Sequence, residues 1–146
     1  MSLREFQTAL ASSSPTPGGG TAAAVSLGQA AALSCMVADL TLGKEKWESG
    51  WEIAEKTQEC AIGMFGRALD LATDDSRSFD AVMMTFKLAK NSDEEKEIRR
   101  QAIREATLGA AEVPLETARL AHSLLEHLPE LAEKGKEEAT RAVMQE

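Results

Sequence analysis

Two features of this sequence carry residue types that could do chemistry. The first is a glycine-rich turn, Pro15-Thr16-Pro17-Gly18-Gly19-Gly20-Thr21, which leads into a predicted helix of small residues. Backbone N–H groups at the start of a helix lack partners within it and lie at the positive end of its dipole, so they can receive a ligand oxygen. The candidate ligand-binding residues are therefore Pro17, Gly18, Gly19, Gly20 and Thr21. The alternative is that the glycines only let the chain turn and the helix pack closely.

The second feature is Asp75, which lies in the middle of a predicted apolar helix face. That face is formed at helical spacing by Ala68, Leu71, Phe79, Val82 and Phe86. A carboxylate removed from water is costly unless it is paired, and a desolvated carboxyl group is suited to exchange protons near neutral pH. Asp75 is therefore a candidate proton-transfer residue. The alternative is a structural salt bridge to Arg67, Lys87 or a residue on the next helix.

The composition limits the partners that this chain can have. Its 146 residues suit a single domain with one core, and its formal net charge of −8 argues against binding nucleic acid or anionic membranes. Cys35 and Cys60 stand in no metal-ligand spacing, so we expect reduced thiols in a cytoplasmic protein. His122 and His127 would project about 140° apart on a helix, and no metal site is predicted. The run Ala22–Ala38 contains polar residues and is not predicted to span a membrane.

The pattern of apolar residues predicts an all-α protein, a multihelical bundle of long and short helices. The predicted helices cover residues 3–11, the glycine turn to 43, 52–88, and 92 to beyond 111, with a kink or a restart of the helix at Pro114 and a break at Pro129. Ser92 and Glu95 have the spacing of a capping box at the start of the fourth helix. The residues from Lys136 to Glu146 are mostly polar and are expected to fray.

The motifs and their order resemble the cyclodeaminase/cyclohydrolase family of folate one-carbon metabolism. This family includes the C-terminal half of formiminotransferase-cyclodeaminase and the stand-alone bacterial methenyltetrahydrofolate cyclohydrolases. The resemblance covers nearly the whole chain, in the segments Ser13–Ala24, Met36–Lys44, Asp75-x-x-Ser78-Phe79, Phe86–Lys90, Glu94–Lys96, Ala110–Leu115 and Glu133–Gly135. Each segment alone is weak evidence for the resemblance, but the order and spacing of all the segments together are specific to this family.

The resemblance implies an all-helical subunit that forms a homodimer through its helices and binds a folate near the glycine turn. It implies that Asp75 transfers the proton, and it places Phe79 among the candidate substrate-binding residues. Lys44 and Lys87 are candidates for holding the glutamate tail, although lysines are more often plain surface charges. The implied reaction is ring closure of 5-formiminotetrahydrofolate with loss of ammonia, or hydrolysis of the methenyl compound. The sequence does not choose between them, and neither needs a metal or redox cofactor.

The sequence departs from the family pattern in two places. Ala89 stands where the family usually has a proline. Family members continue past the glycine that matches Gly135, whereas here Lys136 follows and the sequence ends at Glu146. We therefore expect one domain, residues 1–146, that lacks the last helices of the family. A second interpretation stays open, in which the chain is an inactive, shortened relative that serves as a helical interaction module.

Overall fold

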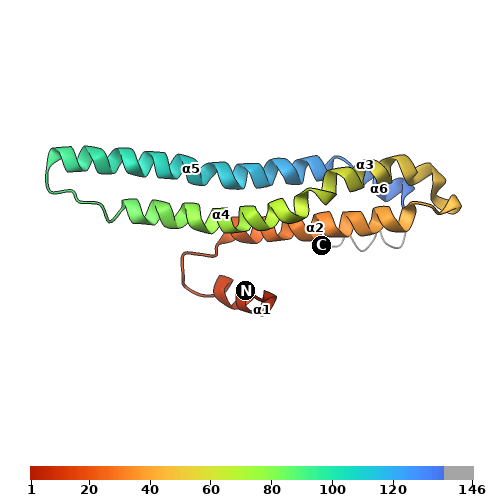
Figure 1. Ribbon diagram of the computed structural model, residues 1–146, viewed down its shortest axis with the longest axis horizontal. Coiled ribbons are helices and arrows are strands. Elements are labelled where there is room, and N and C mark those ends of the chain that lie inside the picture. Colours follow the sequence, from red (N-terminus) through yellow and green to blue (C-terminus); the bar gives the residue numbers. More distant parts are fainter. Residues whose placement is uncertain (137–146) are drawn as a thin grey trace. The chain divides into compact units, whose positions relative to one another are not determined.

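The computed structural model describes residues 1–136, and all regular elements in that range are helical (Figure 1). In chain order they are α1 (Leu3–Leu10), α2 (Gly19–Thr41), the short 3-10 helix η1 (Glu45–Gly50), α3 (Trp51–Ile62), α4 (Met64–Thr85), α5 (Asp93–Leu125) and α6 (Leu128–Lys134). The prediction of an all-α protein is confirmed for this part of the chain. The predicted fraying concerns residues that lie, except for Lys136, outside the described range.

Several helix boundaries follow from local sequence signals. At the start of α5, the backbone N–H of Glu95 donates to Ser92 Oγ at 3.1 Å, and the N–H of Ser92 donates to Glu95 Oε2 at 3.3 Å. The predicted capping box is therefore confirmed. The break near Pro129 is also confirmed, because α6 begins at Leu128 with the proline in its first turn, where a missing N–H is tolerated.

Two predicted boundaries are wrong. The helix expected over residues 52–88 is divided, since α3 ends at Ile62, Gly63 is its C-cap and α4 starts at Met64. Glycine favours helix ends because it loses the most backbone freedom inside a helix. At Pro114 the predicted restart of a helix is wrong, because α5 continues from Asp93 to Leu125, while a kink at this proline stays a prediction. A proline removes one main-chain N–H donor from the helix, but the residues in the turns before and after it keep their N–H donors, so the helix can continue.

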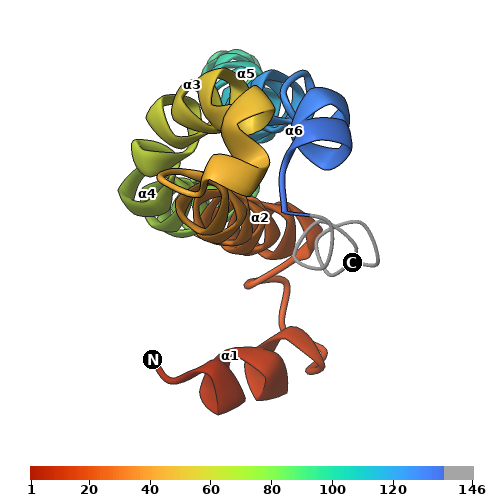
Figure 2. The ribbon, with the colours of Figure 1, turned by 90° about the vertical axis from the view of Figure 1, so that its right-hand side faces the viewer.

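The chain forms two compact units, and α2, α4 and α5 each contribute to both. Among the described residues, unit 2 contains Val25–Leu69 and residues 118–136. One cluster of its buried apolar side chains consists of Leu27, Ala31, Cys35, Ala61, Met64, Ala68 and Leu124. A second cluster consists of Val37, Ala38, Ile53, Ala54 and Leu131, near the point where η1, α3 and α6 contact one another (Figure 2).

Helix α2 supplies much of the core of unit 2. Among the described helices, α2 has the length and hydropathy that a membrane span would need. A helix in the core of a soluble protein can have the same length and hydropathy. Here Leu27, Ala31 and Ala38 are at most 5% exposed, and they belong to clusters with side chains from other helices. Their small size lets neighbouring helices approach α2 closely.

Unit 1 contains Met1–Ala24 and Asp70–Thr117, and it carries most of the residues singled out by the sequence. In it, the later part of α4 and the first part of α5 run antiparallel and are joined by residues 86–92 (Figure 1). Its most buried side chains are small or hydroxylated, apart from Leu71: they are Thr21, Ala24, Leu71, Ala72 and Thr117. Unit 1 therefore has a small core, and polar side chains take part in it.

Candidate functional site

The structure brings the glycine turn and Asp75 together within unit 1. The hydroxyl group of Thr21 donates to Asp75 Oδ2 at 2.8 Å, although 54 positions separate the two residues. Thr21 Oγ1 also lies 3.1 Å from Ser76 Oγ. Thr21 is 5% exposed and Asp75 is half-buried, so this contact is largely shielded from water. A hydroxyl that donates to a carboxylate stabilises its charge and fixes its orientation.

Gly20 makes the close approach of α2 to Asp75 possible. A methyl group at position 20 would lie 2.1 Å from Asp75 Oδ1 and 2.6 Å from its carboxyl carbon. Both distances are far shorter than ordinary contacts between non-bonded atoms. The carboxyl group therefore occupies the space that any larger residue would fill. It lies against the first turn of α2, at the positive end of that helix, where negative charge is favoured.

A second hydrogen bond joins the turn to α4. The hydroxyl group of Thr16 donates to Asp80 Oδ1 at 3.2 Å. The two pairs have the same spacing, since Asp80 is five positions after Asp75 and Thr21 is five positions after Thr16. On α4 itself, the hydroxyl of Ser78 donates to the carbonyl oxygen of Asp75 at 2.9 Å. Sequence reasoning missed Thr16 and Asp80. The signal that could have found them is the equal spacing of a threonine pair and an aspartate pair.

The surroundings of Asp75 differ from the sequence prediction. We expected hydrocarbon neighbours, but Phe79 and Phe86 are 43% and 48% exposed, while Leu71 is fully buried. The predicted apolar face therefore does not extend to these phenylalanines. The carboxylate turns toward the small residues and hydroxyl groups at the start of α2, which can approach it closely. Within residues 1–136 it forms no ion pair, so the alternative of a structural salt bridge is not observed.

The two carboxylate oxygens of Asp75 are placed differently. Oδ2 accepts the hydrogen bond from Thr21. Oδ1 lies beside Gly20 and has no hydrogen-bond partner in the described part of the chain. One oxygen thus holds the group in place, and the other has a lone pair that no donor in residues 1–136 uses and that can accept a proton. This is the division of roles that a general acid–base residue needs.

The other candidate residues lie at different places relative to Asp75 along the chain. Pro17 and Gly18 precede α2 and Gly19 is its first residue, and the carbonyl oxygen of Gly18 accepts from the N–H of Ala22 at 3.0 Å. Gly19 is exposed, with open space around its Cα. Phe79 and Lys87 are exposed residues of unit 1.

Lys44 belongs to unit 2, where it is the N-cap of η1. Its proposed contact with the glutamate tail stays a prediction, as do the binding roles of Phe79 and Lys87.

The cysteines are free thiols in the structure. Loss of hydration, with a smaller effect of the Asp39 carboxylate, raises the pKa of the buried Cys35 thiol. Loss of hydration, followed by the Glu126 carboxylate, likewise raises the pKa of the Cys60 thiol. Both thiols are therefore poor nucleophiles near neutral pH. In the described residues, no group of three or more His, Cys, Asp or Glu side chains could hold a metal ion.

Comparison with known proteins identifies relatives along nearly the whole sequence. Residues 2–143 match the family described as formiminotransferase-cyclodeaminase. A methenyltetrahydrofolate cyclohydrolase from Methylorubrum extorquens is 41% identical over 133 residues, which are 91% of this chain and 64% of the relative. The formimidoyltransferase-cyclodeaminase of Rattus norvegicus is 34% identical over 138 residues, which are 92% of this chain and 25% of the relative.

A solved structure shows the same fold. The crystal structure of formiminotetrahydrofolate cyclodeaminase from Thermotoga maritima matches with a TM-score of 0.77 and 31% sequence identity, over 99% of this chain and 73% of that one. The chain spans about two thirds of the curated cyclohydrolase and a quarter of the curated cyclodeaminase. The match to residues 2–143, together with the fold, shows that this chain belongs to the formiminotransferase-cyclodeaminase family.

Proposed function

We propose that this protein is a folate one-carbon enzyme that acts at the formimino or methenyl carbon of tetrahydrofolate. The family match supports this proposal, and so do relatives named as a cyclohydrolase and as cyclodeaminases. The observation that carries it is the Asp75 carboxylate, held by Thr21 through one oxygen, while the other oxygen lies beside Gly20 with no hydrogen-bond partner in residues 1–136. A helical module that serves only assembly would not require a glycine that makes room for a carboxylate.

As a cyclodeaminase, the protein would use Asp75 to move a proton between two nitrogens. N10 of 5-formiminotetrahydrofolate attacks the formimino carbon and forms the new N10–carbon bond. The formimino group reacts as its protonated amidinium form, so its nitrogen already carries two protons. Asp75 Oδ1 accepts the proton of N10 and delivers it to this nitrogen as the third, and the nitrogen leaves as ammonia when its bond to carbon breaks. The product is the cationic 5,10-methenyl compound, and a nearby carboxylate stabilises positive charge on the reacting carbon.

As a cyclohydrolase, the protein would use the same oxygen as a base. Asp75 accepts a proton from the water molecule that attacks the methenyl carbon and forms the new carbon–oxygen bond. Asp75 then delivers this proton to one of the two nitrogens as its bond to that carbon breaks, and the hydroxyl loses its own proton to solvent, which leaves a formyl group on the other nitrogen. The N–H groups of the glycine turn would hold a pterin oxygen, and Lys44 or Lys87 would meet the glutamate tail. Neither reaction needs a cofactor beyond the folate substrate, and we place both in the cytoplasm.

Asp75→Asn tests this proposal directly. Asparagine keeps the shape of the side chain but cannot accept the proton, so turnover is expected to fall by about 100- to 10,000-fold. The formation of the methenyl product is followed by its absorbance, with ammonia release measured in parallel. A second assay follows hydrolysis of the methenyl compound. The pair of assays decides between the two reactions.

Asp70→Asn is the matched control, since Asp70 is an exposed aspartate of α4. It is expected to keep wild-type activity. Full activity of Asp75→Asn in both assays would exclude Asp75 as the proton carrier.

We also propose that the protein acts as a homodimer. Unit 1 leaves several large apolar side chains of α4 and α5 at least 40% exposed, among them Met83, Met84, Ile98, Leu108 and Leu115. Apolar side chains that are exposed together in one patch are typical of surfaces that bind another protein. Sedimentation at micromolar concentration should therefore give a dimer, and a monomer alone would contradict this proposal.

A further inference from the structure

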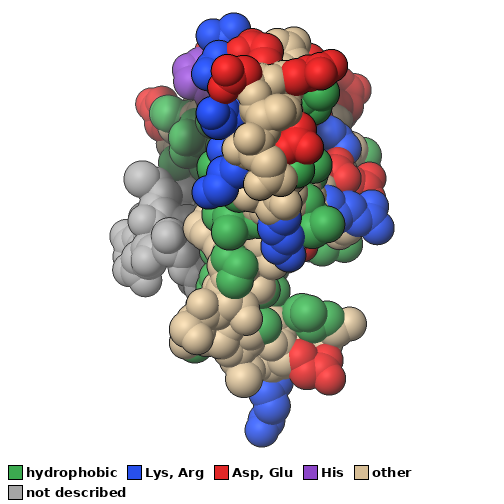
Figure 3. Space-filling model, turned by 90° about the vertical axis from the view of Figure 1, so that its left-hand side faces the viewer, with side chains coloured by type: hydrophobic (Ala, Val, Ile, Leu, Met, Phe, Trp, Pro, Cys, Tyr) green, Lys and Arg blue, Asp and Glu red, His purple; other side chains and the backbone are tan. Residues whose placement is uncertain are grey.

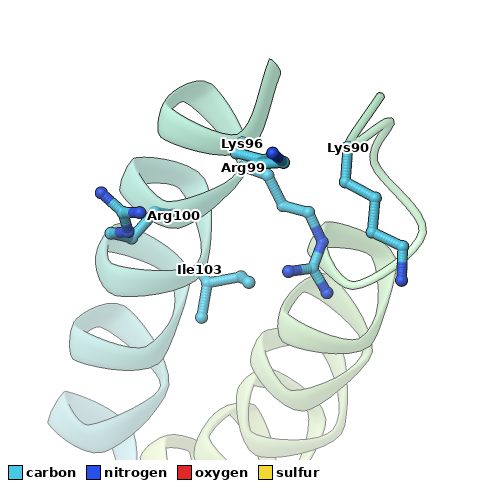
Figure 4. A pocket seen from close by; sticks show the side chains of 5 residues that line it. All are labelled: Lys90, Lys96, Arg99, Arg100 and Ile103. Carbon is cyan, nitrogen blue, oxygen red and sulfur yellow. The ribbon is translucent and has the colours of Figure 1, made fainter. Parts of the chain in front are cut away.

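Four basic side chains line a pocket of about 330 Å³ in unit 1, at the start of α5. Lys90 comes from the connection between α4 and α5, and Lys96, Arg99 and Arg100 come from the first turns of α5. Ile103 is the apolar lining residue. Figure 4 shows the Lys90 and Arg99 side chains extending in the same direction, whereas Arg100 points away from them.

The pocket is a local excess of positive charge in a chain whose net charge is −8. On the face drawn in Figure 3, at the end where α4 and α5 are joined, Lys and Arg side chains lie among acidic and hydrophobic ones. Lys96 and Arg100 each form an ion pair with an acidic residue three positions earlier on α5, so their charges are compensated. Lys90 and Arg99 have no acidic partner within residues 1–136. Two uncompensated cations thus line one pocket.

Arg99 is fixed in position while most of its hydrogen-bonding groups stay unused. Its guanidinium carbon lies 5.6 Å from the centre of the Phe86 ring, and its Nη2 donates to the carbonyl oxygen of Phe86 at 3.4 Å. Its Nε is buried and has no hydrogen-bond partner in the described residues. A guanidinium group has five N–H donors in a rigid fork that matches a carboxylate or phosphate. Arg99 is therefore held ready for an anion that the described part of the chain does not supply.

We propose that this pocket binds an oxyanion, with Arg99 making the charged hydrogen bonds and Lys90 adding a second positive charge. Two sources share this chemistry: a free phosphate or carboxylate, and a carboxylate at the end of a larger ligand. The second source fits the dimensions, because Asp75 lies ten residues, or about 15 Å, before the end of α4 at Thr85, and the next residue, Phe86, contacts Arg99. A ligand held at Asp75 could reach the pocket with a tail of that length. Only this second source rests on the proposed function.

The test uses the full chain and two probes, inorganic phosphate and a triglutamate peptide, followed by calorimetry at low ionic strength. Saturable binding of at least one probe is expected, and Arg99→Gln should weaken it by about 10- to 100-fold. Lys90→Gln, a change at an exposed residue, should weaken it less. Arg104→Gln is the matched control, since Arg104 is an exposed arginine of α5 that does not line the pocket.

The possible outcomes distinguish failure of the pocket proposal from failure of the proposed function. No saturable binding of either probe, or equal binding by wild type, Arg99→Gln and Lys90→Gln, would overturn the proposal whether or not the protein has folate activity. Where the probes bind, the enzyme assay identifies the source. A raised KM in Arg99→Gln with unchanged kcat, and competition by triglutamate, assign the pocket to the tail of the substrate. An unchanged KM assigns it to a separate anion.

Discussion

Gly20→Ala should displace the carboxyl group of Asp75 without disturbing the fold. The new methyl group would lie 2.1 Å from Asp75 Oδ1. Ordinary contact requires about 1.3 Å more than this, so the carboxyl group must rotate away and leave its hydrogen bond to Thr21. A displacement of about 1 Å in a reacting group costs about 100-fold in rate. We therefore expect kcat to fall by about 100-fold.

The stability of Gly20→Ala should change modestly. Alanine in place of glycine stabilises a helix by about 0.5–1 kcal/mol, and forcing a side chain off its preferred rotamer costs about 0.5–1.5 kcal/mol. The lost hydrogen bond to Thr21 costs about 0.5–1.5 kcal/mol more, so the free energy of unfolding should fall by no more than about 2.5 kcal/mol. The measurements are the rate of formation of the methenyl product and urea unfolding followed by circular dichroism.

Two other glycines serve as controls, because an added methyl group at Gly19 or Gly109 would meet no atom within 4 Å. Gly109→Ala repeats the substitution in α5 of the same unit and should keep full activity. Gly19→Ala leaves Asp75 in place, so a loss of activity there would report contact between the turn and the substrate. Wild-type activity of Gly20→Ala, or a loss that Gly109→Ala shares, would refute the steric argument.

Three further predictions concern the hydrogen bond, the core and a thiol. Thr21→Val removes the hydroxyl that donates to Asp75 at 2.8 Å, so kcat should fall by about 10- to 100-fold, and an unchanged kcat would contradict the positioning role. Leu71→Ala, at a fully buried residue, should lower the free energy of unfolding in urea by about 2–5 kcal/mol, whereas Leu69→Ala, at a residue 64% exposed, should change it by about 0.5 kcal/mol or less. The raised pKa of Cys35 leaves less thiolate at a given pH, so its labelling by a disulfide reagent at pH 8 should be slow in the native protein and fast in urea; equal rates would show that burial does not protect it.

The sequence alone predicted the fold class and several helix ends, because these depend on neighbours a few positions apart. Ser92 and Glu95 cap a helix through their own backbone, and Pro129 restarts one for the same local reason. The error at residues 52–88 is local too, since a glycine is tolerated inside some helices and ends others. Gly63 gave no signal strong enough to decide between these two outcomes.

The sequence also singled out the glycine turn and Asp75, the first by its composition and the second by its unexpected place on a helix. That the two meet, and that Gly20 is small because a carboxyl group fills the space beside it, only the tertiary structure decided. The physical reason is distance along the chain. Helical periodicity relates residues a turn or two apart, whereas Thr21 and Asp75 are 54 positions apart and their contact depends on how α2 packs against α4 within unit 1.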